Sequence, residues 1–196
     1  MYSFFALISR LKFIGRWALM RNTVNENVQE HSYMVAVIAY TLAAIDRDVF
    51  AGKADPDRAA SAALFHDASE IMTGDMPTPV KYHNRDIIKA YKEIEKSASK
   101  KLLTTLPKDL IPAFSGVFLP DENSKTYTLV KAADKIAAYI KCVEELNSGN
   151  GEFRLAAEQT KDKIHAFNLP EADYFIKHFI PASNLTIDEL DFSIDN

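Results

Sequence analysis

A chain of 196 residues, of which 47% are hydrophobic and 26% are charged, can bury one substantial core, and this composition excludes an intrinsically disordered protein. The formal net charge of −4 argues against general nucleic-acid binding, because that function usually needs a basic surface. The single cysteine, Cys142, cannot form an internal disulfide, so we expect a reducing compartment and a small buried side chain at this position.

Apolar residues are spaced three and four apart over residues 4–14, which predicts that the chain begins with a helix. This segment has no basic region before its short apolar run, and Arg10, Lys12 and Arg16 break up the sequence after that run. We therefore interpret it as part of the folded domain and not as a signal peptide. No stretch approaches the roughly 18 to 20 uninterrupted apolar residues of a membrane span. A cytoplasmic protein with no membrane partner is expected.

The next two helices carry recognisable start signals. The second is predicted to begin after Asn27, because Asn27 and Glu30 have the spacing of a capping box, and to continue to about Ile45. The third is predicted over residues 56–72, with a proline in its first turn. The sequence TGDMPTPVKYHN, residues 73–84, is predicted to be a loop, because two prolines in three residues cannot continue a helix.

Helical spacing dominates the rest of the chain as well. An amphipathic, charge-rich helix is predicted over residues 85–105, irregular or short helical structure over 106–125, and a long helix over 126–150. Two more helices are predicted over 152–168 and 171–180, and the acidic tail after Pro181 is weakly patterned. The expected fold is therefore all-α, a single domain over residues 1–196 with six or more helices.

Ionisable residues lie on the inward side of three of these predicted helices. His31 is on the apolar row of the second helix, and Asp134 faces apolar neighbours on the long helix. His66 and Asp67 are adjacent, so their side chains point about 100° apart and one ion between these directions could contact both. Alternatively, His31 could be a hydrogen-bonded core histidine, and the His66–Asp67 pair could face solvent together with Glu70.

Together these residues predict a metal site. Buried carboxylates are costly without a compensating charge, and the neighbouring Lys131 and Lys135 are expected to point elsewhere on the helix. Two imidazoles and two carboxylates suit a borderline divalent metal such as Mn, Fe, Co, Ni or Zn, and such a ligand set leaves positions open for water and substrate. Glu70 comes four residues after His66, so it is expected beside the site, one turn along.

A histidine, a distant His-Asp doublet and a distant aspartate, all on helices, form a pattern that resembles the HD-domain metal-dependent phosphohydrolases. From about residue 4 to residue 190 the chain is similar to the bacterial 5′-deoxynucleotidase branch of that superfamily. The segments that carry the similarity are ISRLKFIGRWALMRN, ENVQEHS, FHDASEIMTGDMPTPVKY, YKEIEK and YIKCVEELNSGN. The resemblance implies one HD-type helical bundle with its metal core at about residues 25–145 and substrate contacts from the N-terminal helix.

The resemblance also implies the reaction, which is hydrolysis of a deoxyribonucleoside 5′-monophosphate to the nucleoside and phosphate. One divalent ion would be bound by His31, His66, Asp67 and Asp134, with Co²⁺ or Mn²⁺ expected and Cu²⁺, Zn²⁺, Fe²⁺ or Ni²⁺ as alternatives. Asp67 and Asp134 would also contact the substrate, Asp67 would take part in catalysis, and Glu70 matches the family's acid/base position. A homodimer is expected, and no nucleic-acid polymer is an expected partner.

Arg16 and Trp17 match the family's phosphate- and substrate-contacting pair, with Arg16 also taking part in catalysis. The first 25 residues contain four basic residues and no acidic one, and an anionic ligand would explain this local charge. Three alternatives stay open for this segment. Trp17 could simply be a core residue, the scattered arginines could simply be solvated, and the segment could be an amphipathic helix at a membrane surface.

The sequence GDMPTP matches the family's substrate loop. Asp75 would accept a hydrogen bond from the 3′-hydroxyl of the sugar, and Met76, Pro77 and Thr78 would shape a sugar pocket that excludes a 2′-hydroxyl by steric clash. From the residues alone this segment could equally be a plain turn between helices, because Gly, Asp and Pro favour turns.

The four metal ligands do not separate this function from two alternatives. One is an HD-type phosphohydrolase that acts on a cyclic or polyphosphorylated nucleotide, and the other is a non-catalytic helical module that binds a nucleotide. Arg16, Trp17 and the Asp75 loop favour the monophosphate, and Glu70 favours an enzyme, because a binding module needs no proton-transfer group. The remaining histidines match no functional position: His83, His165 and His178.

Overall fold

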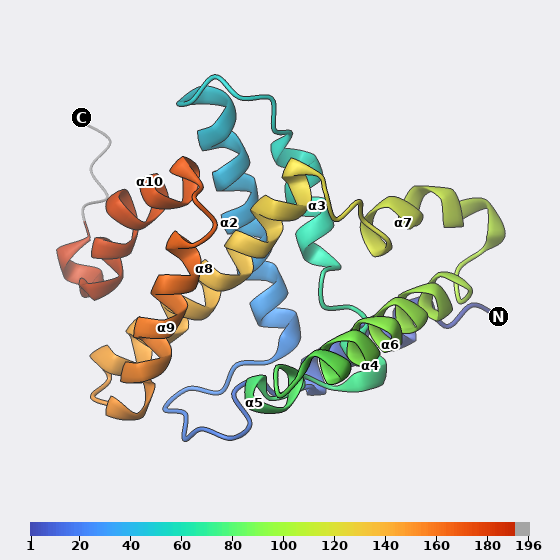
Figure 1. Ribbon diagram of the computed structural model, residues 1–196, viewed down its shortest axis with the longest axis horizontal. Coiled ribbons are helices and arrows are strands. Elements are labelled where there is room, and N and C mark those ends of the chain that lie inside the picture. Colours follow the sequence, from blue (N-terminus) through green and yellow to red (C-terminus); the bar gives the residue numbers. More distant parts are fainter. Residues whose placement is uncertain (191–196) are drawn as a thin grey trace.

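The computed structural model describes residues 1–190 and shows helices joined by short turns (Figure 1). Within these residues there is no β-strand, and Gly15 and Asn27 form one isolated antiparallel bridge. The α-helices are α1 Phe4–Ile8, α2 Val28–Asp48, α3 Pro56–Leu64, α4 Glu70–Thr73, α5 Thr78–Lys81, α6 Arg85–Leu103, α7 Ile111–Phe118, α8 Lys125–Asn147, α9 Arg154–His165 and α10 Pro170–His178. The 3-10 helices are η1 Ser9–Phe13, η2 Lys108–Leu110, η3 Gly151–Phe153, η4 Ile180–Asn184 and η5 Ile187–Glu189. The all-α prediction is confirmed.

The two longest helices, α2 and α8, cross at the centre of the molecule and pack against α3, α9 and α10 (Figure 1). Their contact buries an apolar core whose side chains include Leu42 and Ile136, both fully buried. Each such side chain contributes about 1.5–3 kcal/mol by leaving water. We call this core cluster 1; its buried residues include Val35, Ile38, Ala39, Leu42, Ala63, Leu129, Ala133, Ile136, Ile164 and Phe175.

A second apolar cluster lies between the N-terminal helix, α6 and α7. Phe4 packs edge-on against Phe114 and Phe118, with ring centroids 5.3 and 5.9 Å apart. In Figure 1 the long helix α6 runs alongside α4, and both lie below the crossing of α2 and α8. We call this core cluster 2; its buried residues are Phe4, Ala68, Leu102, Leu103, Leu106 and Phe118.

The predicted start of the second helix is confirmed. The Asn27 side chain accepts hydrogen bonds from the backbone N–H groups of Gln29 and Glu30, both at 3.0 Å. The Glu30 carboxylate in turn accepts from the Asn27 N–H at 3.2 Å, which completes the capping box. This cap fixes the first turn of α2, and the same turn carries His31.

The helix predicted over residues 56–72 is wrong in its middle, because α3 ends at Leu64 and a turn covers residues 65–69. The His66 ring gives the physical reason. Its Nδ1 donates to the carbonyl of Ala63 at 2.7 Å, which is the carbonyl that the Asp67 N–H would use in a continued helix. Ala63 belongs to cluster 1 and Ala68 to cluster 2, so this turn leads the chain from one cluster to the other.

The loop predicted over residues 73–84 is also partly wrong, because it contains the one-turn helix α5. The second proline of the segment, Pro79, lies in the first turn of α5, where no backbone N–H is needed. The turn before α5 uses Gly74 at φ +69°, a conformation that glycine adopts without strain.

The helix predicted over residues 4–14 is α-helical only over α1, and the chain continues as the 3-10 helix η1. The remaining predicted helices are confirmed with shifts of a few residues at their ends. The segment 106–125 contains α7, and the tail after Pro181 contains η5. Residues 191–196, the end of the predicted domain and of the acidic tail, lie outside the described residues. No helix among the described residues is both long enough and apolar enough to cross a membrane.

Candidate active site

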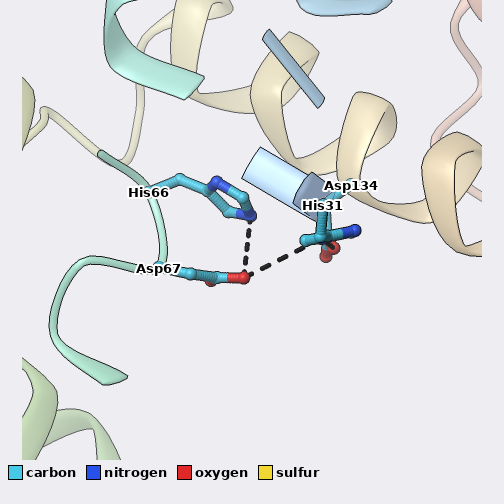
Figure 2. Close-up of side chains that lie close together, drawn as sticks. All are labelled: His31, His66, Asp67 and Asp134. Atoms are coloured by element: carbon cyan, nitrogen blue, oxygen red, sulfur yellow. Dashed lines mark hydrogen bonds and ion pairs between the residues drawn. The ribbon is translucent and has the colours of Figure 1, made fainter. Parts of the chain in front are cut away.

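Four side chains of types that can bind a metal ion come together from three parts of the chain. His31 comes from the first turn of α2, His66 and Asp67 come from the turn after α3, and Asp134 comes from the middle of α8. One ligand atom from each lies within 4.8 Å of the others (Figure 2). Residues predicted from three separate sequence segments are thus brought to one point.

His31 is fully buried, and it faces carboxylates with both ring nitrogens. Nε2 lies 3.0 Å from Oδ1 of Asp134 and 3.8 Å from Oδ2 of Asp67. Nδ1, on the other side of the ring, lies 3.7 Å from Oε1 of Glu26. Burial opposes the charged imidazolium, but the carboxylates of Asp134 and Glu26 outweigh it and raise the pKa of His31.

His66 presents the same ring nitrogen to the site. Because its Nδ1–H donates to a carbonyl, Nε2 is left without a proton in the neutral ring, and Nε2 lies 3.0 Å from Oδ2 of Asp67. Among the described residues this buried Nε2 has no hydrogen-bond partner. Both histidines therefore direct Nε2 toward Asp67 (Figure 2), and Nε2 of His31 also contacts Asp134.

The two aspartates stay ionised. Burial raises the pKa of Asp67, but the neighbouring His66 and His31 outweigh this effect and hold the pKa well below its ordinary value. For Asp134, burial is likewise opposed by Lys135 and His31, and its pKa is lowered strongly. Two carboxylates held close together in a poorly hydrated place are costly without a cation between them.

These residues fit a divalent metal ion. An ion that contacts nitrogen and carboxylate oxygen at about 2.0–2.2 Å brings opposite ligand atoms to about 4.2 Å from each other. The four ligand atoms, all within 4.8 Å, need only small movements to reach that spacing. Because Nδ1 of His66 donates to the Ala63 carbonyl, Nε2 is the ring nitrogen that would contact such an ion. Two nitrogens and two oxygens suit a borderline transition metal.

Arg16 and Trp17 reach this site through Glu26. Oε2 of Glu26 accepts from Nε of Arg16 at 3.1 Å and from Nε1 of Trp17 at 2.9 Å. The Arg16 guanidinium also lies 3.7 Å from Oδ2 of Asp67, so it borders the candidate metal site. The Trp17 ring packs on Phe153 at a centroid distance of 5.3 Å, so this tryptophan is partly a core residue and partly a neighbour of the site.

Sequence reasoning did not identify Glu26. A signal was present, because Glu26 is the first acidic residue of the chain and follows a basic segment. Its partners, however, lie on two different segments, and only their positions in space reveal them.

Glu70 and Asp75 lie close enough to Asp67 for its charge to contribute to raised pKa values at both carboxyls. Glu70 is 4% exposed, and burial followed by the charges of Asp67 and Asp75 raises its pKa to about 9. Asp75, in the segment between α4 and α5, also has a raised pKa, chiefly from burial and then from Asp67, while Arg16 opposes the shift. A buried carboxyl that holds its proton near neutral pH is suited to proton transfer.

The segment after Glu70 is fastened to α6. The hydroxyl of Tyr91 lies 3.2 Å from Oγ1 of Thr73 and 3.4 Å from the carbonyl of Gly74. At the other end of the segment, Nζ of Lys81 donates to Glu95 at 2.9 Å. These contacts hold both ends of the predicted substrate loop, whose middle residues lie between them: Met76 and Pro77, both half-buried, and Thr78, which is exposed at the start of α5.

One expectation about the long helix is wrong. Lys135 does not point away from the site, because its flexible side chain bends back and places Nζ 2.9 Å from Oδ2 of Asp134. The other histidines lie away from the four ligands. His83 is exposed, His165 pairs with Asp173 at 2.9 Å, and His178 stacks on Tyr174 at a centroid distance of 4.3 Å.

Known proteins similar to this chain cover nearly its whole length. A family model described as 5′-deoxynucleotidase YfbR-like matches residues 3–183. The chain is 46% identical over 195 residues to 5′-deoxynucleotidase yfbR of Photorhabdus temperata, with 99% of each chain covered. It is 47% identical over 190 residues to 5′-deoxynucleotidase YfbR of Escherichia coli O127:H6, with 95% of this chain and 94% of that one covered.

A solved structure shows the same fold. An HD-domain phosphohydrolase from Listeria innocua superposes with a TM-score of 0.80 at 24% identity, covering 92% of this chain and 88% of the other. At this level of identity the likeness speaks for the fold alone, and it confirms the predicted HD-type helical bundle.

Proposed function

The chain belongs to the YfbR-like 5′-deoxynucleotidase family, and from this membership we propose that it hydrolyses deoxyribonucleoside 5′-monophosphates to deoxynucleoside and phosphate. It is a phosphoric monoester hydrolase. The observation that carries the proposal is the convergence of His31, His66, Asp67 and Asp134 within 4.8 Å, beside the guanidinium of Arg16. A site for a divalent cation next to an arginine is suited to the phosphate of a monoester.

We infer that His31, His66, Asp67 and Asp134 hold one divalent metal ion, with Co²⁺ or Mn²⁺ expected and Cu²⁺, Zn²⁺, Fe²⁺ or Ni²⁺ as alternatives. When bound, such an ion supplies Lewis acidity, which lowers the pKa of a water molecule and polarises a phosphate oxygen. Asp67 and Asp134 also border the place where the phosphate would lie. Arg16 has its Nε engaged by Glu26 and its Nη1 3.7 Å from Oδ2 of Asp67, and the guanidinium has further N–H groups that could meet phosphate oxygens.

We infer that Glu70 moves the proton of the reaction. Hydrolysis forms a bond between a water oxygen and phosphorus, breaks the bond from phosphorus to the 5′ oxygen, and leaves that oxygen in need of a proton. The raised pKa of Glu70, about 9, supports a carboxyl that carries a proton at neutral pH and can give it to the 5′ oxygen. Ala or Gln at this position could not do so.

The substrate loop and Trp17 are assigned to the sugar. Asp75 accepts a hydrogen bond from the 3′-hydroxyl, and Trp17, Met76, Pro77 and Thr78 form the walls of the sugar pocket. The two anchors on α6, through Tyr91 and Glu95, support this role because a wall that discriminates by steric clash has to stay in place. We further propose that the enzyme works in the cytoplasm as a homodimer.

A panel of nucleotides tests the function directly. The purified protein is assayed for phosphate release with added Co²⁺ or Mn²⁺ from the deoxynucleoside 5′-monophosphates, the matching ribonucleotides, and cyclic and polyphosphorylated nucleotides. Release from the deoxynucleoside monophosphates, and weaker release from the ribonucleotides, is expected. Release only from cyclic or polyphosphorylated nucleotides, or binding without release, would contradict the proposal.

A further inference from the structure

Glu26 contacts three residues that the proposed function uses, and it has no assigned role. Its Oε2 accepts hydrogen bonds from Arg16 and Trp17 at 3.1 and 2.9 Å. Its Oε1 lies 3.7 Å from Nδ1 of His31, at the edge of the ring away from the aspartates. One carboxylate, 16% exposed, therefore lies between the phosphate side and the metal side of the site.

The backbone holds Glu26 and Arg16 in a fixed relation. The Arg16 N–H donates to the carbonyl of Glu26 at 2.9 Å, and the Val28 N–H donates to the carbonyl of Ile14 at 3.0 Å. These two bonds flank the antiparallel bridge between Gly15 and Asn27. Because Asn27 also caps α2, the segment that carries Glu26 is fixed at the same point as the turn that carries His31.

Trp17 adds a sign of strain at this point. Its φ of +58° lies in the left-handed region, which a bulky side chain rarely adopts and which costs on the order of 1–3 kcal/mol. The hydrogen bond from its indole to Glu26 and the packing of its ring on Phe153 are contacts that can offset this cost.

We propose that Glu26 is a positioning residue that orients Arg16, Trp17 and His31 together, and so links the phosphate-binding side of the site to the metal-binding side. This inference rests on the proposed function for the identity of the substrate, but its prediction about metal binding does not depend on that function. A histidine that binds a metal with one nitrogen is commonly oriented by a carboxylate at the other nitrogen. Glu26 faces Nδ1 of His31 in this way at 3.7 Å, a charge contact longer than a hydrogen bond, and the same carboxylate accepts hydrogen bonds from Arg16 and Trp17.

Glu26 also keeps the Arg16 guanidinium from competing with the metal ion for the Asp67 carboxylate. The Arg16 guanidinium is 3.7 Å from Oδ2 of Asp67, and Glu26 engages it at Nε on the other edge. Without the Glu26 charge, the nearest strong acceptor for this guanidinium is Asp67 itself. A variant that lacks the charge would therefore weaken metal binding in two ways, through a less firmly held His31 and through competition at Asp67.

The test compares Glu26→Gln with Glu30→Gln, a matched change in the same segment. Glu30 is exposed and serves only the capping box among the contacts described, and Gln also serves at that position. Binding of Mn²⁺ alone to metal-stripped protein is measured by isothermal titration calorimetry. Emission from Trp17, the single tryptophan, is recorded on the same samples because its indole donates to Glu26.

For Glu26→Gln, the Kd for Mn²⁺ is expected to rise about tenfold, the usual cost of losing a group that orients a metal ligand. Trp17 emission should shift, and kcat/KM for deoxyadenosine 5′-monophosphate should fall about tenfold even at saturating Mn²⁺. Glu30→Gln should leave Trp17 emission unshifted and keep the Kd for Mn²⁺ and kcat/KM within twofold of the wild-type values. Glu26→Asp keeps the charge on a shorter stem, so it should lose less Mn²⁺ affinity than Glu26→Gln.

One result would overturn the inference: a folded Glu26→Gln protein whose Trp17 emission is unshifted and whose Kd for Mn²⁺ and kcat/KM are within twofold of the wild-type values. If Glu26→Gln does not fold, Glu26→Asp serves the same test, and wild-type values in that variant for metal affinity and emission count against the inference. A wild-type protein that releases no phosphate from any deoxynucleoside monophosphate refutes the proposed function instead, and leaves the Mn²⁺ and Trp17 measurements valid.

Discussion

The ammonium nitrogen of Lys135 lies 2.9 Å from Oδ2 of Asp134, so a positive charge stands beside one of the four candidate metal ligands. Such a charge opposes a divalent cation at the same carboxylate. Because the Lys135 side chain is one-third exposed, solvent screens the effect and keeps it small.

We expect Lys135→Met to lower the Kd for Mn²⁺ by about threefold at low salt, with the gain shrinking as ionic strength rises. Calorimetric titrations at two salt concentrations measure this, with Lys161→Met on the exposed side of α9 as the control. An unchanged or weaker affinity in Lys135→Met would mean that its ammonium does not oppose the ion.

Metal binding and proton transfer should separate in two variants. Asp134→Asn removes the charge of a proposed ligand, so the purified protein should lose its bound metal and its turnover together. Glu70→Gln leaves the four ligands intact, so it should keep the metal while kcat falls by about 100-fold or more. Elemental analysis measures the bound metal, and phosphate release measures turnover on the same preparations. Near wild-type turnover in metal-loaded Glu70→Gln would contradict the role of Glu70.

The metal-free protein should lose stability as pH rises from about 5 to 9. The ordinary pKa of a glutamate is 4.5, and in the fold the pKa of Glu70 is raised to about 9. An acid with a raised pKa binds more protons folded than unfolded in this window, so its contribution is full below the lower value and is lost as pH approaches the higher one.

His31, whose pKa is also raised, changes stability in the same direction, so the Glu70 contribution has to be isolated by a variant. We expect Glu70→Gln to show a flatter decline of Tm between about pH 5 and pH 9 in the presence of a chelator. Parallel curves for wild type and Glu70→Gln would show that the Glu70 carboxyl is not perturbed.

Glu145 should be a large single contributor to stability outside the site. It is fully buried on α8 and accepts from Thr23, Asn150 and the buried Lys141. Removing it in Glu145→Ala leaves the Lys141 ammonium buried without its carboxylate, which costs about 3–5 kcal/mol. Urea denaturation measures the loss, and Glu144→Ala, at the exposed neighbouring position, should change the unfolding free energy by less than about 1 kcal/mol.

Several parts of this structure could be predicted from local patterns in the sequence. The start of α2 was predictable because the capping box involves only residues within one turn, Asn27 and Glu30. The inward placement of His31 and Asp134 was predictable because helical spacing fixes which residues share a face with buried apolar neighbours. That these positions lie within reach of one ion depends on the packing of α2 on α8, which the spacing alone does not contain.

The break at residues 65–69 could not be predicted from periodicity, because good helix formers flank it at Leu64 and Glu70 and the competing hydrogen bond comes from the His66 side chain. The roles of Glu26 and Lys135 were missed for a related reason. A glutamate in a turn and a lysine on a helix have many side-chain conformations, and only the assembled site selects one of them.

The turn that carries His66 and Asp67 joins two packing units, since Ala63 belongs to cluster 1 and Ala68 to cluster 2. His31 and Asp134, in contrast, come from α2 and α8, which contribute buried residues to cluster 1 and none to cluster 2. The distances among the four candidate ligands therefore depend on the position of cluster 2 relative to cluster 1. Loosening cluster 2 would move half of the ligand set while α2 and α8 stay packed, so inactivation on heating should come before the loss of helical structure.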